Sequence, residues 1–223
     1  MNYTTQYDKQ LLNQFEHLHR HPQLLPFIGA EWNDSRHKLL LVAESHYLPE
    51  KYNYQIGYSE WNDLSYLKSL DDNKIFDWTN TRKNVEGVVE KWGHRMHNGL
   101  SRSLINVFNY NSKMEAYRNI SYYNYFQRPA HEEGGSIKGY TTSDDDDLAF
   151  DFYKVIVNVL KPQWVIFLSK PAFESYRKKN GWHKEENVSR VAPPTSRYWN
   201  VETKEHDHRT SKEKFEEIIG KVF

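Results

Sequence analysis

The stretch DDDDLAFDFYKVIVNVLKPQWVIFLS, residues 144–169, decides the fold class. In its first part apolar residues recur every three or four positions, as on a helix face that packs against a core. The helix dipole favours the four aspartates at the start. Pro162 ends this helix, and the apolar run of residues 163–169 predicts a strand that is buried on both faces. A helix that leads directly into such a strand is typical of a parallel βαβ unit.

The same alternation extends to both sides of that stretch. Apolar or aromatic runs predict three more strands, at residues 38–43, 119–126 and 187–191. Helical periodicity or a capping pattern predicts further helices at residues 5–20, 80–92, 100–108 and 171–180 and after Thr210. Buried strands that alternate with helices predict an α/β fold, a three-layer α/β/α sandwich with a short, mainly parallel, four-stranded sheet.

The composition indicates a folded protein without cysteine chemistry. The 223 residues include 16 Tyr, 11 Phe and 7 Trp, and no linker-like segment divides them, so we expect one domain over residues 1–223. Lys plus Arg number 30 and Asp plus Glu 30, so the net charge of +0 gives no general attraction to nucleic acid or acidic membranes. The absence of cysteine excludes disulfides, thiolate zinc sites and cysteine-bound iron–sulfur clusters. With no membrane-length apolar run and no apolar leader, we expect a cytoplasmic protein.

Three polar residues follow the predicted strand 38–43, at the edge of the sheet where parallel α/β proteins place their sites. They are Glu44, Ser45 and His46. A carboxylate there is suited to position water or to stabilise a cation, and an imidazole is suited to move a proton, so these three are the predicted catalytic residues. In the alternative interpretation Glu44 and Ser45 cap the next turn and His46 faces solvent.

The predicted binding residues lie in two other segments. Asn124, at the end of the strand 119–126, offers one donor and one acceptor to the amide edge of a base. Nearby aromatic residues are suited to stack on that base, or else belong to the core; the candidates in the loop after residue 44 are Tyr47, Tyr52, Tyr54 and Trp61. The hydroxyls of Thr195 and Ser196 with the Arg197 guanidinium are suited to hold phosphate, or else form a solvated turn.

Metal sites are the weaker interpretation of the remaining polar clusters. Residues 17–21 and 206–208 space their histidines like ligands, and residues 144–147 are four aspartates, which suit magnesium. Histidines on a polar helix or tail, and aspartates at a helix start, need no metal to explain them. No phosphate-binding glycine loop and no dinucleotide fingerprint is present. We therefore expect no metal and no other cofactor.

In their order along the chain, these segments resemble the uracil-DNA glycosylase superfamily. That family has Gly-Gln-Asp-Pro-Tyr-His or Gly-Glu-Ala-Pro-Gly after its first strand, and here Ala43-Glu-Ser-His-Tyr47 occupies that place. The resemblance implies a three-layer α/β/α fold with a four-stranded parallel sheet over residues 26–223. It leaves residues 1–25 as an N-terminal helical extension and implies a substrate contact for Tyr47.

Two later motifs add to the resemblance. The base-reading asparagine of the family, followed by Arg-Pro, is matched by Asn124 with Arg128-Pro129, which implies that Arg128 belongs to the binding site. The His-Pro-Ser loop of the family is matched by residues 193–196, without its histidine. Ser45 stands where the family has its catalytic aspartate.

Three functions follow as hypotheses. The first is a DNA-repair-like enzyme that hydrolyses the N-glycosidic bond of a base in DNA or a nucleotide, with Glu44 positioning water and Asn124 holding the base. The second is a non-catalytic protein that binds a nucleobase, a nucleotide, or single-stranded or damaged DNA, and the substituted motif positions favour it. Both require Glu44, Asn124 and Ser196 to converge on one cleft. The third is a metal-dependent hydrolase built on Glu44, His46 and the aspartates.

Overall fold

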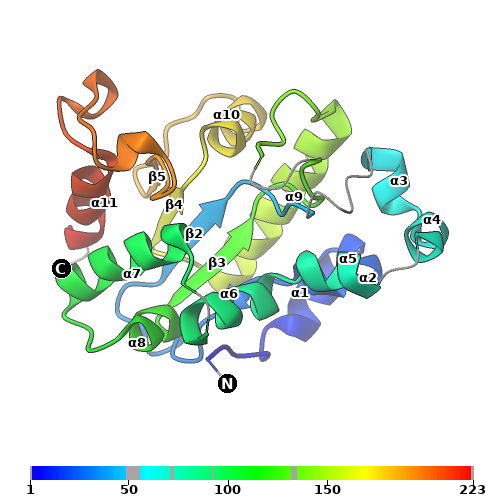
Figure 1. Ribbon diagram of the computed structural model, residues 1–223, viewed down its shortest axis with the longest axis horizontal. Coiled ribbons are helices and arrows are strands. Elements are labelled where there is room, and N and C mark those ends of the chain that lie inside the picture. Colours follow the sequence, from blue (N-terminus) through cyan, green and yellow to red (C-terminus); the bar gives the residue numbers. More distant parts are fainter. Residues whose placement is uncertain (1, 49–55, 71–72, 92, 132–134, 222–223) are drawn as a thin grey trace.

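The computed structural model describes residues 2–48, 56–70, 73–91, 93–131 and 135–221 (Figure 1). At its centre lies a sheet with strand order β1-β3-β2-β4-β5, in which β2, β3, β4 and β5 are parallel and β1 is antiparallel to β3. The strands are β1 Phe27–Ile28, β2 Leu39–Ala43, β3 Ile120–Asn124, β4 Trp164–Phe167 and β5 Val188–Arg190. The α/β class expected from the sequence is confirmed.

The sheet has five strands, so the predicted number of four was wrong. The four predicted strands all form, and the additional strand is β1 at the edge of the sheet. β1 pairs Phe27 with Tyr122 and Ile28 with Ser121. Two residues are too few to show an apolar run or an alternation, so the sequence pattern carried no signal for this strand.

Helices surround the strands and account for most of the remaining chain. They are α1 Asp8–Gln14, α2 His17–Arg20, α3 Tyr58–Asn62, α4 Leu64–Ser69, α5 Asn73–Trp78, α6 Thr81–Glu90, α7 Arg95–Phe108, α8 Lys113–Arg118, α9 Ser143–Leu160, α10 Lys170–Lys179 and α11 Ser211–Gly220. Short 3₁₀ helices cover Pro22–Leu24, Arg197–Trp199 and Lys204–His206. In the part of the chain that the structure describes, no helix has both the length and the apolar character needed to cross a bilayer.

The helices differ from the sequence prediction in several places. The helix expected at 5–20 forms as α1 and α2, because the chain becomes extended at Phe15, whose ring stacks on Phe152 of α9 with centroids 4.7 Å apart. The region 44–62, expected as a loop, ends in α3, and residues 49–55 of it lie outside the described chain. α4, α5 and α8 were not predicted; they are six residues each, shorter than the two turns that make helical periodicity visible.

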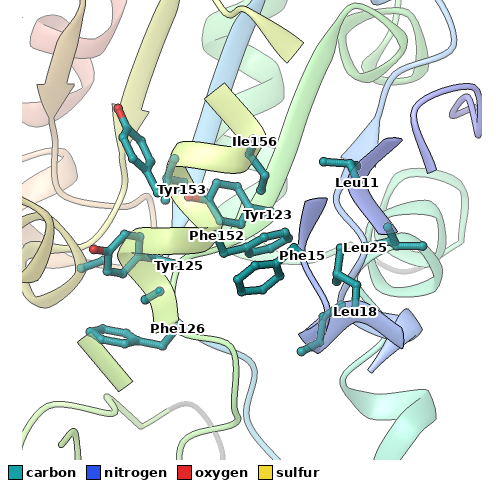
Figure 2. Packing of buried hydrophobic residues seen from close by; sticks show 14 of the residues in the cluster. Leu11, Phe15, Leu18, Leu25, Tyr123, Tyr125, Phe126, Phe152, Tyr153 and Ile156 are labelled. Carbon is teal, nitrogen blue, oxygen red and sulfur yellow. The ribbon is translucent and has the colours of Figure 1, made fainter. Parts of the chain in front are cut away.

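Hydrophobic cores lie on both faces of the sheet. Since successive side chains of a strand point to opposite faces, β2 places Leu40 and Val42 in one core and Leu39 and Leu41 in the other. The first core packs under α1, α2, α9 and α10, and Figure 2 shows its aromatic centre. The second packs under α6, α7, α8 and α11. This arrangement is compatible with the predicted three-layer sandwich.

Candidate functional site

β2 and β3 end in register and bring two of the predicted segments together. Ala43, the last residue of β2, lies opposite Asn124, the last residue of β3. Beyond the strands the chains stay paired, because Phe126 N donates to the Glu44 carbonyl at 2.9 Å and Ala130 N donates to the His46 carbonyl at 2.7 Å. The segments 44–47 and 124–130 therefore run side by side at the carboxyl edge of the sheet.

A pocket of about 340 Å³ opens between this edge, α6 and the N-terminal turn of α7. Of the predicted site residues, Ser45, His46, Tyr47 and Asn124 line it. The rest of its wall comes from residues that the sequence reasoning did not select: Trp78, Thr81, Asn84, Val85, Val88, Gly93, His94, Met96, His97 and Tyr122. Apolar and aromatic side chains with a few polar groups are typical of small-molecule sites.

A hydrogen-bonded group of three side chains forms the polar part of the wall. His46 Nε2 lies 3.0 Å from Asn124 Nδ2 and 3.0 Å from the hydroxyl of Thr81. Thr81 is placed there by the start of α6, which Asn80 caps by accepting from Lys83 N at 2.9 Å. Because the Asn124 amide donates to Nε2, neutral His46 carries its proton on Nδ1. This bond fixes the orientation of Asn124 at the end of its strand.

The pocket wall carries no formal charge at neutral pH. Burial lowers the pKa of His46 to about 3, and burial with neighbouring His94 and Lys113 lowers the pKa of His97 to about 3. Burial also lowers the pKa of His94. Among the described residues that line the pocket there is no Asp, Glu, Lys or Arg. The site is thus suited to hold an uncharged ligand, and its imidazoles are poor proton carriers near pH 7.

Glu44 is directed to a different group of partners. One carboxylate oxygen accepts from the Ser136 hydroxyl at 2.5 Å and from Ile137 N at 3.0 Å. The other accepts from the hydroxyl of Ser169 at 2.5 Å, and Ser169 also caps α10 by accepting from Ala172 N. Glu44 does not line the pocket. Its contacts tie the strand end to the segment at 136–137 and to α10.

Arg128 is part of the interior. Its guanidinium pairs with the Asp145 carboxylate, Nε to Oδ1 at 2.7 Å and Nη2 to Oδ2 at 3.0 Å, and Nη2 donates to the Tyr140 carbonyl at 2.6 Å. The two side chains of the ion pair are 2% and 4% exposed. Asp145 also completes the capping box of α9 with Thr142. The arginine that the resemblance assigned to substrate binding therefore connects segment 124–130 to the start of α9.

The loop that contains Thr195, Ser196 and Arg197 lies beside α7 and does not line the pocket. Ser196 caps the 3₁₀ helix that follows by accepting from Tyr198 N at 3.2 Å, and exposed Arg197 donates to the Tyr198 hydroxyl. The loop approaches α7 at Gly99, where an added Cβ would lie 2.4 Å from Pro194 Cβ. The convergence of Glu44, Asn124 and Ser196 on one cleft, which both base-directed hypotheses required, is not seen in this pocket.

The other candidates for stacking and metal binding have separate places. Trp61 is fully buried, donates from Nε1 to the Gln127 carbonyl at 2.6 Å and does not line the pocket described above. Tyr52 and Tyr54 lie outside the described residues. His17 and His21 are buried with ring centroids 4.5 Å apart, and His21 stacks on Trp61. Across the described ranges no group of three or more His, Asp or Glu side chains is placed to hold a metal ion.

The residues that sequence reasoning missed have only weak local signals. Tyr122 lies two positions before Asn124 and so shares its face of β3, a relation the alternation of a strand makes readable. His94 and His97 are three positions apart at the start of α7, one helical turn. Neither spacing says which strand end these residues face.

Comparison with protein-family models, with curated proteins and with solved structures gave no match to this chain. The resemblance to the uracil-DNA glycosylase superfamily therefore depends on the order of the motifs alone.

Proposed function

We propose that the protein binds a nucleobase, free or as part of a nucleotide or a single-stranded or damaged DNA, in the pocket between the ends of β2 and β3 and the helices α6 and α7. The observation that carries this proposal is Asn124, which His46 holds in a fixed orientation. The wall around it is uncharged and contains aromatic rings. An amide side chain supplies the donor and acceptor that the edge of a base requires. Because Glu44 and Ser196 do not line this pocket, the proposal depends on Asn124 and its surroundings and not on the convergence that the motif order implied.

The lack of charge favours a base over a more polar ligand. Tyr47, Trp78 and Tyr122 supply ring surface to the wall, and aromatic rings stack on every base. A phosphate inside the pocket would meet no cation among the described lining residues and would lose its hydration without compensation. A nucleotide or a strand of DNA would therefore place its base in the pocket and its phosphate outside.

The contacts of Glu44 favour binding over hydrolysis. A carboxylate that positions water for attack on a glycosidic bond must face the bound base, and Glu44 instead accepts hydrogen bonds from Ser136, Ile137 and Ser169. His46, with a pKa of about 3, is neutral, and its Nε2 already accepts from Asn124 and lies 3.0 Å from the Thr81 hydroxyl. We therefore take base binding as the function and treat glycosidic hydrolysis as an outcome of the test.

The test is a calorimetric titration of the full chain with uracil, with hypoxanthine and with adenine. We expect at least one base to bind, and Asn124→Ala to weaken that binding about tenfold. This corresponds to a loss of about 1.4 kcal/mol of binding free energy when the hydrogen-bonding amide is removed. Asn158→Ala, an exposed asparagine of α9 outside the pocket, is the matched control. Equal affinities for wild type and Asn124→Ala, or no binding of any base, would contradict the proposal. Abasic sites formed in oligonucleotides with uracil or hypoxanthine would replace it with the enzyme hypothesis.

A further inference from the structure

His97 is a buried histidine of α7 whose two ring nitrogens have different surroundings. Its ring lies against Tyr117 and Tyr122, with centroid distances of 5.6 and 5.2 Å. Nδ1 lies 2.6 Å from the phenolic oxygen of Tyr117. Within the described part of the chain Nε2 has no hydrogen-bond partner, and the residue forms part of the pocket wall. One nitrogen is therefore committed to the protein and the other is left for a ligand.

Tyr117 decides which of these nitrogens carries the proton. This side chain, on α8, is 0% exposed, and burial raises the pKa of its phenol well above the ordinary value, so the hydroxyl keeps its hydrogen. Its one hydrogen-bond partner in the described ranges is His97 Nδ1. If the phenol accepted from Nδ1, its own hydrogen would be buried without an acceptor, which is unfavourable. Tyr117 therefore donates to Nδ1, and neutral His97 carries its proton on Nε2.

Asn124 offers the complementary group on the same wall. Its Nδ2 donates to His46 Nε2, and its Oδ1 has no partner in the described part of the chain. The pocket thus presents a donor, His97 Nε2–H, and an acceptor, Asn124 Oδ1, in an uncharged setting. A histidine whose tautomer is fixed in this way acts as a donor only, and so distinguishes ligands more sharply than one that can exchange its tautomer.

We propose that His97 is a specificity-determining residue of the pocket: its Nε2–H donates to a carbonyl oxygen of the bound base, and Tyr117 is the positioning residue that keeps the proton on Nε2. The inference depends on the proposed base binding. Hypoxanthine and adenine form the matched ligand pair. Hypoxanthine has a carbonyl where adenine has an amino group, so the fixed donor meets an acceptor in the first and another donor in the second.

The tautomer is tested without any ligand. In a long-range ¹H–¹⁵N spectrum of the full chain labelled in its histidines, we expect a protonated Nε2 and an unprotonated Nδ1 for His97, assigned by the signal that His97→Phe removes. Tyr117→Phe should convert this signal to a mixture of tautomers. Tyr110→Phe, which removes the hydroxyl of a ring that packs against His37 and Phe108 outside the pocket, should leave it unchanged. A protonated Nδ1 in the wild type would overturn the inference.

Ligand discrimination is tested by calorimetry with hypoxanthine and adenine. We expect wild type to prefer hypoxanthine, His97→Phe to reduce the ratio of the two affinities about tenfold, and Tyr117→Phe to reduce it about threefold, with both variants checked for a native-like spectrum. Tyr110→Phe should keep the wild-type ratio. If a base binds and the ratio is the same in His97→Phe, this inference fails and base binding stands. If no base binds to the wild type, both fail, and the tautomer spectrum still reports whether Tyr117 fixes the proton.

Discussion

Glu44 and His46 lie two residues apart at the end of β2, yet they belong to different environments. The Glu44 carboxylate is held by donors from the segment 136–137 and from Ser169 at the start of α10. His46 lies in an uncharged pocket and orients Asn124. At this edge of the sheet the charged side chains connect parts of the fold, and the neutral ones form the wall that a ligand can reach. A polar residue after a buried strand is thus no sufficient sign of catalysis.

The largest expected effect tests whether the charges of this edge are structural. Asp145→Ala leaves the Arg128 guanidinium buried without its counter-ion, and we expect the free energy of unfolding to fall by about 3–5 kcal/mol. Urea unfolding measures it. Asp151→Ala removes an exposed partner of Lys154 on the same helix and should change the free energy of unfolding by about 0.5 kcal/mol or less. An Asp145→Ala protein of wild-type stability with weakened base binding would assign the pair to the site instead.

The next largest expected effect is a change of stability with pH, which tests whether the histidines of the pocket are neutral. The pKa values of His46 and His97 are lowered to about 3 in the folded protein, while both ordinarily titrate near 6.5. Between these values the unfolded chain binds more protons, so stability is complete above about pH 6.5 and falls as the pH decreases, by up to about 2 kcal/mol for each histidine at pH 5.

Two measurements at pH 7.5 and pH 5 check this expectation. Urea unfolding should show the lower stability at pH 5, to which buried His17 and His21, with pKa values lowered to about 4 and about 3, also contribute. His46→Gln and His97→Phe should each reduce the difference, and His183→Gln, at an exposed position, should not change it. Base binding to the protein that remains folded should be the same at both values, because neither imidazole gains a proton there. A pH dependence of stability that is the same in His46→Gln and His97→Phe as in the wild type, or base binding that is lost at pH 5, would show that the pocket titrates.

The smallest expected effect concerns the carboxylate side. Glu44→Gln keeps one oxygen for Ile137 N and a polar group for the serine hydroxyls, so we expect base affinity to change by about twofold or less, below about 0.5 kcal/mol. Calorimetry with the base that binds wild type best is the measurement, with Asn124→Ala as the reference for a real loss. A Glu44→Gln variant that loses affinity as Asn124→Ala does would remove the distinction between the two sides.

Helices, strands and caps that depend on residues close together in the chain could be predicted from the sequence. The apolar runs of β2 and β4, and the Thr210–Glu213 capping box of α11, form where the pattern indicated. The contacts between segments far apart in the chain could not be predicted in this way. Glu44 meets Ser136, 92 positions away, and His46 meets Thr81, 35 positions away. Which of two adjacent polar residues faces a pocket depends on these partners, and no local spacing encodes them.

The function proposed for the uncharged pocket depends on whether a base binds there. The most direct measurement is a ¹H–¹⁵N titration of the labelled full chain with the free base that calorimetry selects, following the side-chain amide of Asn124 and the rings of His46 and His97. We predict that these signals shift together and saturate at one base per chain, while the backbone amides of Glu44, Ile137 and Ser196 move little. Saturating shifts centred on Glu44 and Ser196, with Asn124 unaffected, would contradict the assignment of the uncharged pocket as the base-binding site.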